Sequence, residues 1–215
     1  MVKTVYQAFS DRAAASSITI ASVRIFAFEG DSRSIAEAYP SMWVPSPLAL
    51  GITKALSGST LANLVAAARL AEITAVPAVK LSGQRYYAVV GPMGANDLGA
   101  YPGATDAIAA ASYAAVMAGY TDSLYAAGFD RVVLCTELPT GNATHNTRRN
   151  LLNVIYTTAY PGSAVTICDM AADPIMGPDT SFATSPSNWT DSTHPNAAGN
   201  LILAGVLAPV LNALT

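Results

Sequence analysis

Charged side chains are scarce in this chain of 215 residues. Asp, Glu, Lys and Arg make up 12% of it, about half the usual share of a globular protein. The formal net charge is −3. Arg148 and Arg149 form the one basic pair that stands out, and a solvated helix face is the simpler interpretation of that pair. We therefore expect no nucleic-acid partner.

Cysteine and histidine are rare as well, with two of each. Cys135 and Cys168 both lie in apolar runs. This position favours two buried thiols, because a buried free cysteine behaves as a small hydrophobic residue. A disulfide is the alternative, and the cysteine count does not settle the compartment. No Cys and His spacing suits a zinc ion, so no metal site is expected.

Long apolar runs are missing too. The longest candidate, residues 201–214, is too short to cross a bilayer and contains Pro209, so we expect no membrane span. Residues 1–15 carry Lys3, Asp11 and Arg12 and lack the apolar centre of a signal peptide. We interpret residues 1–20 as an N-terminal extension of unassigned role, either a mature start or the tail of a preceding domain. The compartment stays open, with an extracellular location slightly favoured.

Apolar residues make up 52% of the chain, which is enough for one large core in a single domain over residues 21–215. Short β-branched runs alternate with longer Ala-rich runs. The predicted strands cover residues 22–28, 51–56, 86–90, 131–136 and 164–168. The predicted helices cover residues 59–73, 106–127, 145–158 and 196–211. Residues 74–85 contain Pro77 and Gly83 and are predicted as a loop.

This alternation predicts an α/β domain, a three-layer α/β/α sandwich with a mostly parallel, five-stranded sheet. Ligands of such sheets bind beyond the carboxyl ends of the strands. Polar turns that contain glycine follow three of the predicted strands, at residues 29–32, 57–60 and 94–97. We expect the functional site where these turns meet.

His194 is the candidate general base. Asp191 lies three residues before it and is close enough in a tight turn to accept a hydrogen bond from Nδ1. Pro195 disfavours a helical conformation at His194 and is suited to begin the helix that follows. A surface histidine in a capping loop is an equally good interpretation of this motif alone. His145 lies in a polar segment without a nearby carboxylate, and we expect an exposed loop histidine there.

Ser32 is the candidate nucleophile, because it directly follows an apolar strand and stands at the expected start of a helix. Gly30 allows a tight turn before it. An ordinary helix cap at Asp31 or Ser32 is the alternative. The chain has no Gly-x-Ser-x-Gly motif, which excludes the nucleophile elbow of α/β-hydrolases.

Acyl transfer also needs hydrogen-bond donors directed at an oxyanion. The backbone N–H of Gly58, the side-chain amide of Asn96 and the N–H of Ser32 come from three different strand ends. Taken singly, Gly58 and Asn96 fit ordinary turn positions equally well. Their order along an α/β framework is harder to explain in that way.

These motifs together resemble the SGNH hydrolase family, also called GDSL esterases and lipases. The resemblance spans residues 30–196 and rests on four blocks in the family's order, which are 30–32 (Gly-Asp-Ser), 57–60 (Ser-Gly-Ser-Thr), 94–98 (Gly-Ala-Asn-Asp-Leu) and 191–196 (Asp-Ser-Thr-His-Pro-Asn). One departure is Arg33, which stands where the family name implies Leu and places a cation beside the nucleophile.

The resemblance implies a flavodoxin-like SGNH hydrolase fold and a two-step ester hydrolysis through an acyl-enzyme on Ser32. It implies Asp191 and His194 as the rest of a catalytic triad, an oxyanion hole of Ser32, Gly58 and Asn96, and no metal or organic cofactor. The substrate we expect is a small-molecule or glycan ester with a short acyl group such as acetyl. The oligomeric state is not predicted.

Three residues are candidates for substrate binding, namely Arg33, Trp43 and Tyr101. The two aromatic residues, with Tyr39, are placed to form a rim around a sugar or acyl chain. Core packing is the alternative for Trp43, and loop anchoring is the alternative for Tyr101. A different function, a noncatalytic binding or structural module on the same scaffold within a larger extracellular or viral protein, also fits the fold.

Overall fold

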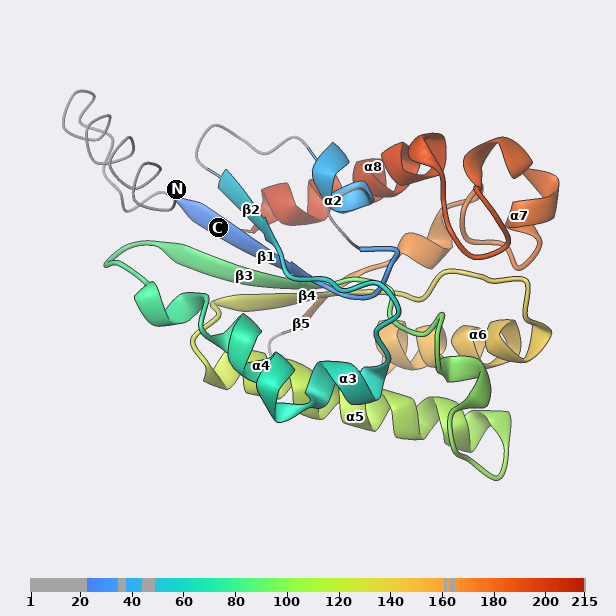
Figure 1. Cartoon of the computed structure of the whole chain (residues 1–215), viewed down its shortest axis with the longest axis horizontal. Coiled ribbons are helices and arrows are strands. Elements are labelled where there is room, and N and C mark those ends of the chain that lie inside the picture. Colours follow the sequence, from blue (N-terminus) through green and yellow to red (C-terminus); the bar gives the residue numbers. More distant parts are fainter. Residues whose placement is uncertain (1–22, 35–37, 44–48, 161, 163–164, 215) are drawn as a thin grey trace.

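The computed structural model describes residues 23–34, 38–43, 49–160, 162 and 165–214. Residues 1–20, predicted as an extension, lie outside this part of the chain. The described residues form three layers, with a sheet between two sets of helices (Figure 1). This arrangement is the three-layer α/β/α sandwich that the sequence predicts.

The sheet is parallel throughout, with strand order β2-β1-β3-β4-β5. Its strands are β1 (Arg24–Glu29), β2 (Ala49–Thr53), β3 (Arg85–Val90), β4 (Arg131–Cys135) and β5 (Val165–Cys168). Each corresponds to a strand predicted from an apolar run. Because β1 lies between β2 and β3, the turns that follow these three strands emerge side by side at one edge of the sheet.

Helices cover both faces of the sheet (Figure 1). One face carries α3 (Leu61–Val65), α4 (Ala67–Thr74), α5 (Asp106–Ala126) and α6 (Ala143–Thr158). The other carries α2 (Tyr39–Met42), α7 (Ser181–Thr184) and α8 (Ala197–Ala213). Short 3₁₀ turns lie at η2 (Pro77–Val79), η3 (Leu98–Ala100), η4 (Met170–Ala172) and η5 (Pro186–Asn188).

Side-chain caps explain where the long helices begin. Thr105 accepts from the N–H of Ile108 at the start of α5, and Asn196 accepts from two N–H groups at the start of α8. Thr60 and Asn63 form a reciprocal capping box at α3. These caps satisfy N–H groups that have no partner within the helix.

Three helix predictions need correction. The single helix predicted over residues 59–73 is two helices, because Ala66 is extended with φ −60° and ψ 137°. No glycine or proline marks that break in the sequence. The short helices α2 and α7 are not predicted, and η2 lies inside the segment predicted as loop. At Ser32, where the sequence predicts the start of a helix, the described residues 31–34 form a turn.

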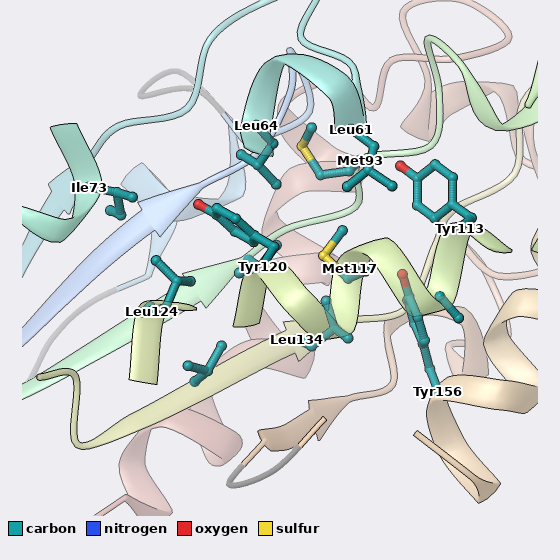
Figure 2. Close-up of a cluster of buried hydrophobic side chains, with 14 of the residues drawn as sticks. Leu61, Leu64, Ile73, Met93, Tyr113, Met117, Tyr120, Leu124, Leu134 and Tyr156 are labelled. Atoms are coloured by element: carbon teal, nitrogen blue, oxygen red, sulfur yellow. The ribbon is translucent and has the colours of Figure 1, made fainter. Parts of the chain in front are cut away.

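Successive strand residues alternate between two buried cores, one on each face of the sheet. Ile25 and Ala27 of β1 face the core under α3 to α6, whereas Phe26 and Phe28 face the core under α2 and α8. Figure 2 shows part of the first core, where Leu61 and Leu64 of α3 and Met117 and Tyr120 of α5 point toward one another. The two cores fix the sheet on both faces.

Both cysteines are buried and free, as the sequence predicts. Cys135 and Cys168 occupy opposite positions in the β4–β5 register. Among the described residues, no helix is long and apolar enough to cross a membrane.

A buried ion pair lies at the carboxyl end of β1. The Glu29 carboxylate is fully buried and accepts a hydrogen bond from Arg69 of α4, which also pairs with Glu72. Burial raises the pKa of Glu29 from its ordinary 4.5 to about 7, although Arg69 opposes this rise.

We predict that this carboxyl group makes the stability depend on pH. Between pH 4.5 and about 7, the folded state keeps a proton that the unfolded state releases. Across that range, rising pH should lower the free energy of unfolding of the wild type relative to Glu29→Gln. The change is at most about 3.5 kcal/mol, since one pKa unit corresponds to about 1.4 kcal/mol. Urea denaturation of both proteins at several pH values measures it. Parallel pH dependences of the two proteins would contradict the prediction.

Candidate active site

Ser32 and His194 meet beyond the carboxyl end of β1. Ser32 Oγ lies 2.9 Å from His194 Nε2, and 162 positions separate the two residues in the chain. Ser32 belongs to the turn after β1, and His194 belongs to the loop before α8. The fold therefore brings together the two residues that the sequence predicts as nucleophile and base.

Asp191 orients the imidazole from the same loop. Its Oδ2 and Oδ1 lie 2.9 Å and 3.1 Å from His194 Nδ1. Oδ1 also accepts from the N–H groups of Thr193 and His194, both at 2.7 Å. Partial burial acts to raise the pKa of Asp191, but these hydrogen bonds outweigh it and hold the pKa below its ordinary value. The carboxylate is thus kept charged beside the ring.

Backbone hydrogen bonds hold this loop in place. The N–H of Thr190 donates to the carbonyl of His194 at 2.8 Å, and the loop's ends pair through a bridge between Trp189 and Pro195. The N–H of Gly141, from the loop after β4, donates to the carbonyl of Ser192 at 2.8 Å. The imidazole nevertheless stays open to solvent, since the side chain of His194 is 43% exposed.

The turn that presents Ser32 depends on Gly30. Gly30 has φ +151°, a value that disfavours residues with a side chain. A Cβ at this position would also lie 2.5 Å from Ser34 Oγ. The turn is closed by a hydrogen bond of 3.0 Å from the N–H of Ser34 to the carbonyl of Asp31.

Gly58 and Asn96 come from the two neighbouring strand ends. Gly58 has φ +76°, is exposed, and has no heavy atom within 4 Å of where a Cβ would stand. Asn96 donates one amide hydrogen to the carbonyl of Ser59 at 2.8 Å. An amide has two hydrogens, so one remains for a ligand. The next residue, Asp97, accepts from the N–H of Leu61 at 2.8 Å. Residues 96 and 97 together hold the turn that contains Gly58.

Arg33 does not face a substrate, contrary to the expectation from sequence. Its side chain is fully buried and pairs with Asp31 at 3.4 Å and with Glu137 at 3.1 Å. Its Nη1 donates to the carbonyl of Leu138 at 3.3 Å. The two carboxylates draw the guanidinium inward, so Arg33 is a structural cation of the turn that contains Ser32.

The predicted aromatic rim is also absent among the candidate residues. Trp43 is buried and packs on Phe26, with ring centroids 4.8 Å apart. Tyr101 packs edge-on against Tyr113 at 4.9 Å. Tyr39 is fully buried in the core of Trp43. Trp43 therefore packs in the core and Tyr101 anchors its loop. These are the two alternative interpretations that the sequence left open.

His145 is not an exposed loop residue, which corrects the sequence-based prediction. It lies in the first turn of α6, is buried, and its Nε2 lies 3.1 Å from the carbonyl of Leu138. Burial lowers the pKa of His145 to about 4, and the nearby cation of Arg33 adds to that effect. A neutral imidazole donating to Leu138 explains this position.

Glu137 is a residue near the site that the sequence analysis does not single out. It follows β4 and is buried, and its carboxylate accepts from the N–H groups of Met93 and Gly94. The signal available in the sequence is an acidic residue directly after an apolar run that ends at a predicted strand end. Within the described part of the chain, no three His, Cys, Asp or Glu side chains gather to hold a metal ion.

No family model matches the sequence, and no curated protein is similar to it. Solved structures do share its fold. A lipolytic protein of the G-D-S-L family from Veillonella parvula matches with a TM-score of 0.62 and 12% identity, over 89% of this chain and 100% of that one. Axe2, an acetylxylan esterase from Geobacillus stearothermophilus, matches with a TM-score of 0.56 and 16% identity, over 90% and 94%.

An extracellular lipase from Streptomyces rimosus matches with a TM-score of 0.53 and 16% identity, over 90% of this chain and 100% of that one. The class that the fold defines is the parallel three-layer α/β sandwich. Within this class, the chain has the fold of the SGNH/GDSL hydrolases, as its sequence motifs predict.

We predict that the imidazole of His145 stays neutral down to about pH 4 in the folded protein. The imidazole of the unfolded chain takes up its proton near pH 6.5. Acidification from pH 6.5 to about 4 should therefore lower the contribution of His145 to the free energy of unfolding. Histidine-selective NMR across this pH range measures the titration, with His145→Gln assigning the signal. A His145 signal that titrates above pH 6 would contradict the prediction.

Proposed function

We propose that this protein hydrolyses carboxylic esters through an acyl-enzyme on Ser32. The observation that carries the proposal is the hydrogen-bonded chain from Ser32 Oγ through the imidazole of His194 to the Asp191 carboxylate. In this order a nucleophile, a base and an orienting acid have the geometry that acyl transfer needs. The fold shared with lipolytic proteins and an acetylxylan esterase supports the same reaction class.

The proposed reaction has two steps. Ser32 Oγ attacks the ester carbonyl while His194 Nε2 takes its proton, and Asp191 stabilises the imidazolium that forms. The tetrahedral intermediate then collapses, and His194 returns the proton to the departing alcohol. A water molecule, deprotonated by His194, attacks the acyl-enzyme, and the acid leaves as Ser32 regains its proton.

The oxyanion of each tetrahedral intermediate needs donors beside Ser32. We assign this role to the N–H of Ser32, the N–H of Gly58 and the free amide hydrogen of Asn96. The support is that Gly58 is unhindered and that Asn96, through the carbonyl of Ser59, is bonded to the turn of Gly58. Fixed donors of this kind stabilise charge that develops only in the transition state.

We propose a short acyl group, such as acetyl, on a small-molecule or carbohydrate alcohol. The open position of His194 and Asp191 supports this choice, since their side chains are 43% and 54% exposed. A cavity of about 550 Å³ between α6 and residues 169–179 contains none of Ser32, Asp191 and His194. We therefore do not assign the acyl group to that cavity.

The first experiment measures hydrolysis of p-nitrophenyl acetate, butyrate and octanoate from about pH 5 to 9 by the wild type and Ser32→Ala. The wild type should be active, and Ser32→Ala should remove the activity while leaving thermal unfolding unchanged. Activity should rise with pH as an imidazole loses its proton, since the base must be neutral. The kcat/KM should fall from acetate to octanoate.

Two other results have distinct meanings. Equal turnover of all three esters would overturn the short-acyl proposal and leave the esterase in place. Wild-type activity no greater than that of Ser32→Ala on these esters and on acetylated xylan would overturn the esterase and favour the noncatalytic module.

We predict that Asn96→Ala lowers kcat by about 10²- to 10³-fold with a smaller change in KM, because the lost donor acts mainly in the transition state. Steady-state kinetics on p-nitrophenyl acetate measures the effect. Asn150→Ala is a matched control, since this exposed amide of α6 pairs with Asp179 and belongs to none of the turns that carry Ser32, Gly58 and Asn96. Equal kcat values for both variants would remove Asn96 from the oxyanion hole.

A further inference from the structure

One buried carboxylate connects two parts of the candidate site. The side chain of Glu137 is 1% exposed and accepts three hydrogen bonds. Oε1 accepts from the N–H of Met93 at 2.7 Å, and Oε2 accepts from the N–H of Gly94 at 2.9 Å and from Arg33 Nη2 at 3.1 Å.

The three donors belong to segments that carry site residues. Arg33 directly follows Ser32 in the nucleophile turn, and its N–H also donates to Asp31 Oδ1 at 2.8 Å. Met93 and Gly94 lie in the loop after β3 that presents Asn96. A single carboxylate thus bonds to the Ser32 turn on one side and to the Asn96 loop on the other.

Glu137 is itself held in place from α6. Its N–H donates to Asn153 Oδ1 at 2.8 Å, and its carbonyl accepts from Asn153 Nδ2 at 2.9 Å and from Arg149 Nη1 at 3.1 Å. Both backbone polar groups of Glu137 are therefore bonded to side chains of one long helix. The backbone of Glu137 is thus fixed on α6, and its carboxylate holds the Ser32 turn and the Asn96 loop from that fixed position.

The charges around Glu137 make this arrangement sensitive to substitution. Burial raises the pKa of Glu137, and the guanidinium of Arg33 with the two N–H groups opposes that rise. Asp31 pairs with the same Nη2 of Arg33 at 3.4 Å. Removal of one member of such a buried set leaves its partners uncompensated, so they move to find new ones.

We propose that Glu137 is a positioning residue of this site, whose carboxylate fixes the Ser32 turn relative to the Asn96 loop and so assembles the oxyanion donors before substrate binds. The inference rests on the proposed ester hydrolysis. Glu137 contacts no substrate, and it acts through Arg33 on one side and through Met93 and Gly94 on the other.

The test is a double-mutant cycle in the full chain with p-nitrophenyl acetate. Glu137→Gln keeps the shape of the side chain but replaces one acceptor oxygen with an NH₂ group, which cannot accept from Arg33, Met93 or Gly94. Glu137→Gln should lower kcat by about 10- to 100-fold with little change in KM, since small displacements of the donors reduce their stabilisation of the transition state more than their binding of the substrate. In an Asn96→Ala background the same substitution should lose most of its effect, because the donor that it positions is gone.

Glu29→Gln is the matched control, as Glu29 is a buried, ion-paired carboxylate at the end of β1, a strand of the same sheet. It should change stability but leave kcat within about twofold in both backgrounds. If Glu137→Gln lowers kcat by the same factor in both backgrounds, or only as much as Glu29→Gln does, Glu137 has a merely structural role and the proposal is overturned.

Two further measurements keep the proposal testable. Arg33→Lys retains a cation but replaces the separate Nη1 and Nη2, which bond to Leu138 and Glu137, with a single nitrogen. It should reproduce the loss of kcat, and wild-type kcat in this variant overturns the proposal. Hydrogen exchange at the amides of Met93 and Gly94 reads the geometry without any activity. Protection lost in Glu137→Gln supports the positioning role, and unchanged protection overturns it, even if the wild type hydrolyses no ester.

Discussion

The neighbouring positions of Ser32, Gly58 and Asn96 follow from the parallel pairing of β1 with both β2 and β3. Parallel strands end at the same edge of a sheet, so the turns after these three strands emerge as neighbours. Ser32, Gly58 and Asn96 belong to these turns. Since each strand has apolar residues on both faces, helices must cover the sheet twice, and that leaves its edge as the place where polar groups collect.

The sequence predicts well what depends on local pattern. Apolar runs identify the five strands, and the spacing of Asp191 and His194 within one short loop predicts their hydrogen bond. The sequence does not reveal which charges face inward. The polar residues next to Arg33 and His145 in the chain suggest that both side chains are exposed. In the fold, Arg33 has Asp31 and Glu137 as buried partners, and His145 has the carbonyl of Leu138. Asp31 lies two positions from Arg33, and Leu138 lies seven from His145. Glu137 is 104 positions from Arg33 and meets it only when β1 and β4 enter one sheet.

Burial of polar groups is concentrated at the carboxyl edge of the sheet. Asp31, Arg33 and Glu137 form one buried set, and Glu29 with Arg69 forms another. Desolvation of such groups opposes folding, so hydrophobic replacements are often as stable. Their concentration beside the turns of Ser32 and Asn96 fits a requirement for fixed geometry rather than for stability. The break between α3 and α4 at Ala66 is different, because no contact of the described residues accounts for it.

The separation of 162 positions between Ser32 and His194 has a consequence for the order of assembly during synthesis. β1, β2 and β3 are synthesised before residues 189–196, so these strands can pair before those residues leave the ribosome. Until α8 packs against the face that contains Phe26 and Phe28, Ser32 has no imidazole beside it. A nascent chain can therefore complete most of its sheet while Ser32 still lacks a hydrogen-bond partner at His194. The packing of α8 against the sheet is the event that brings the two side chains together.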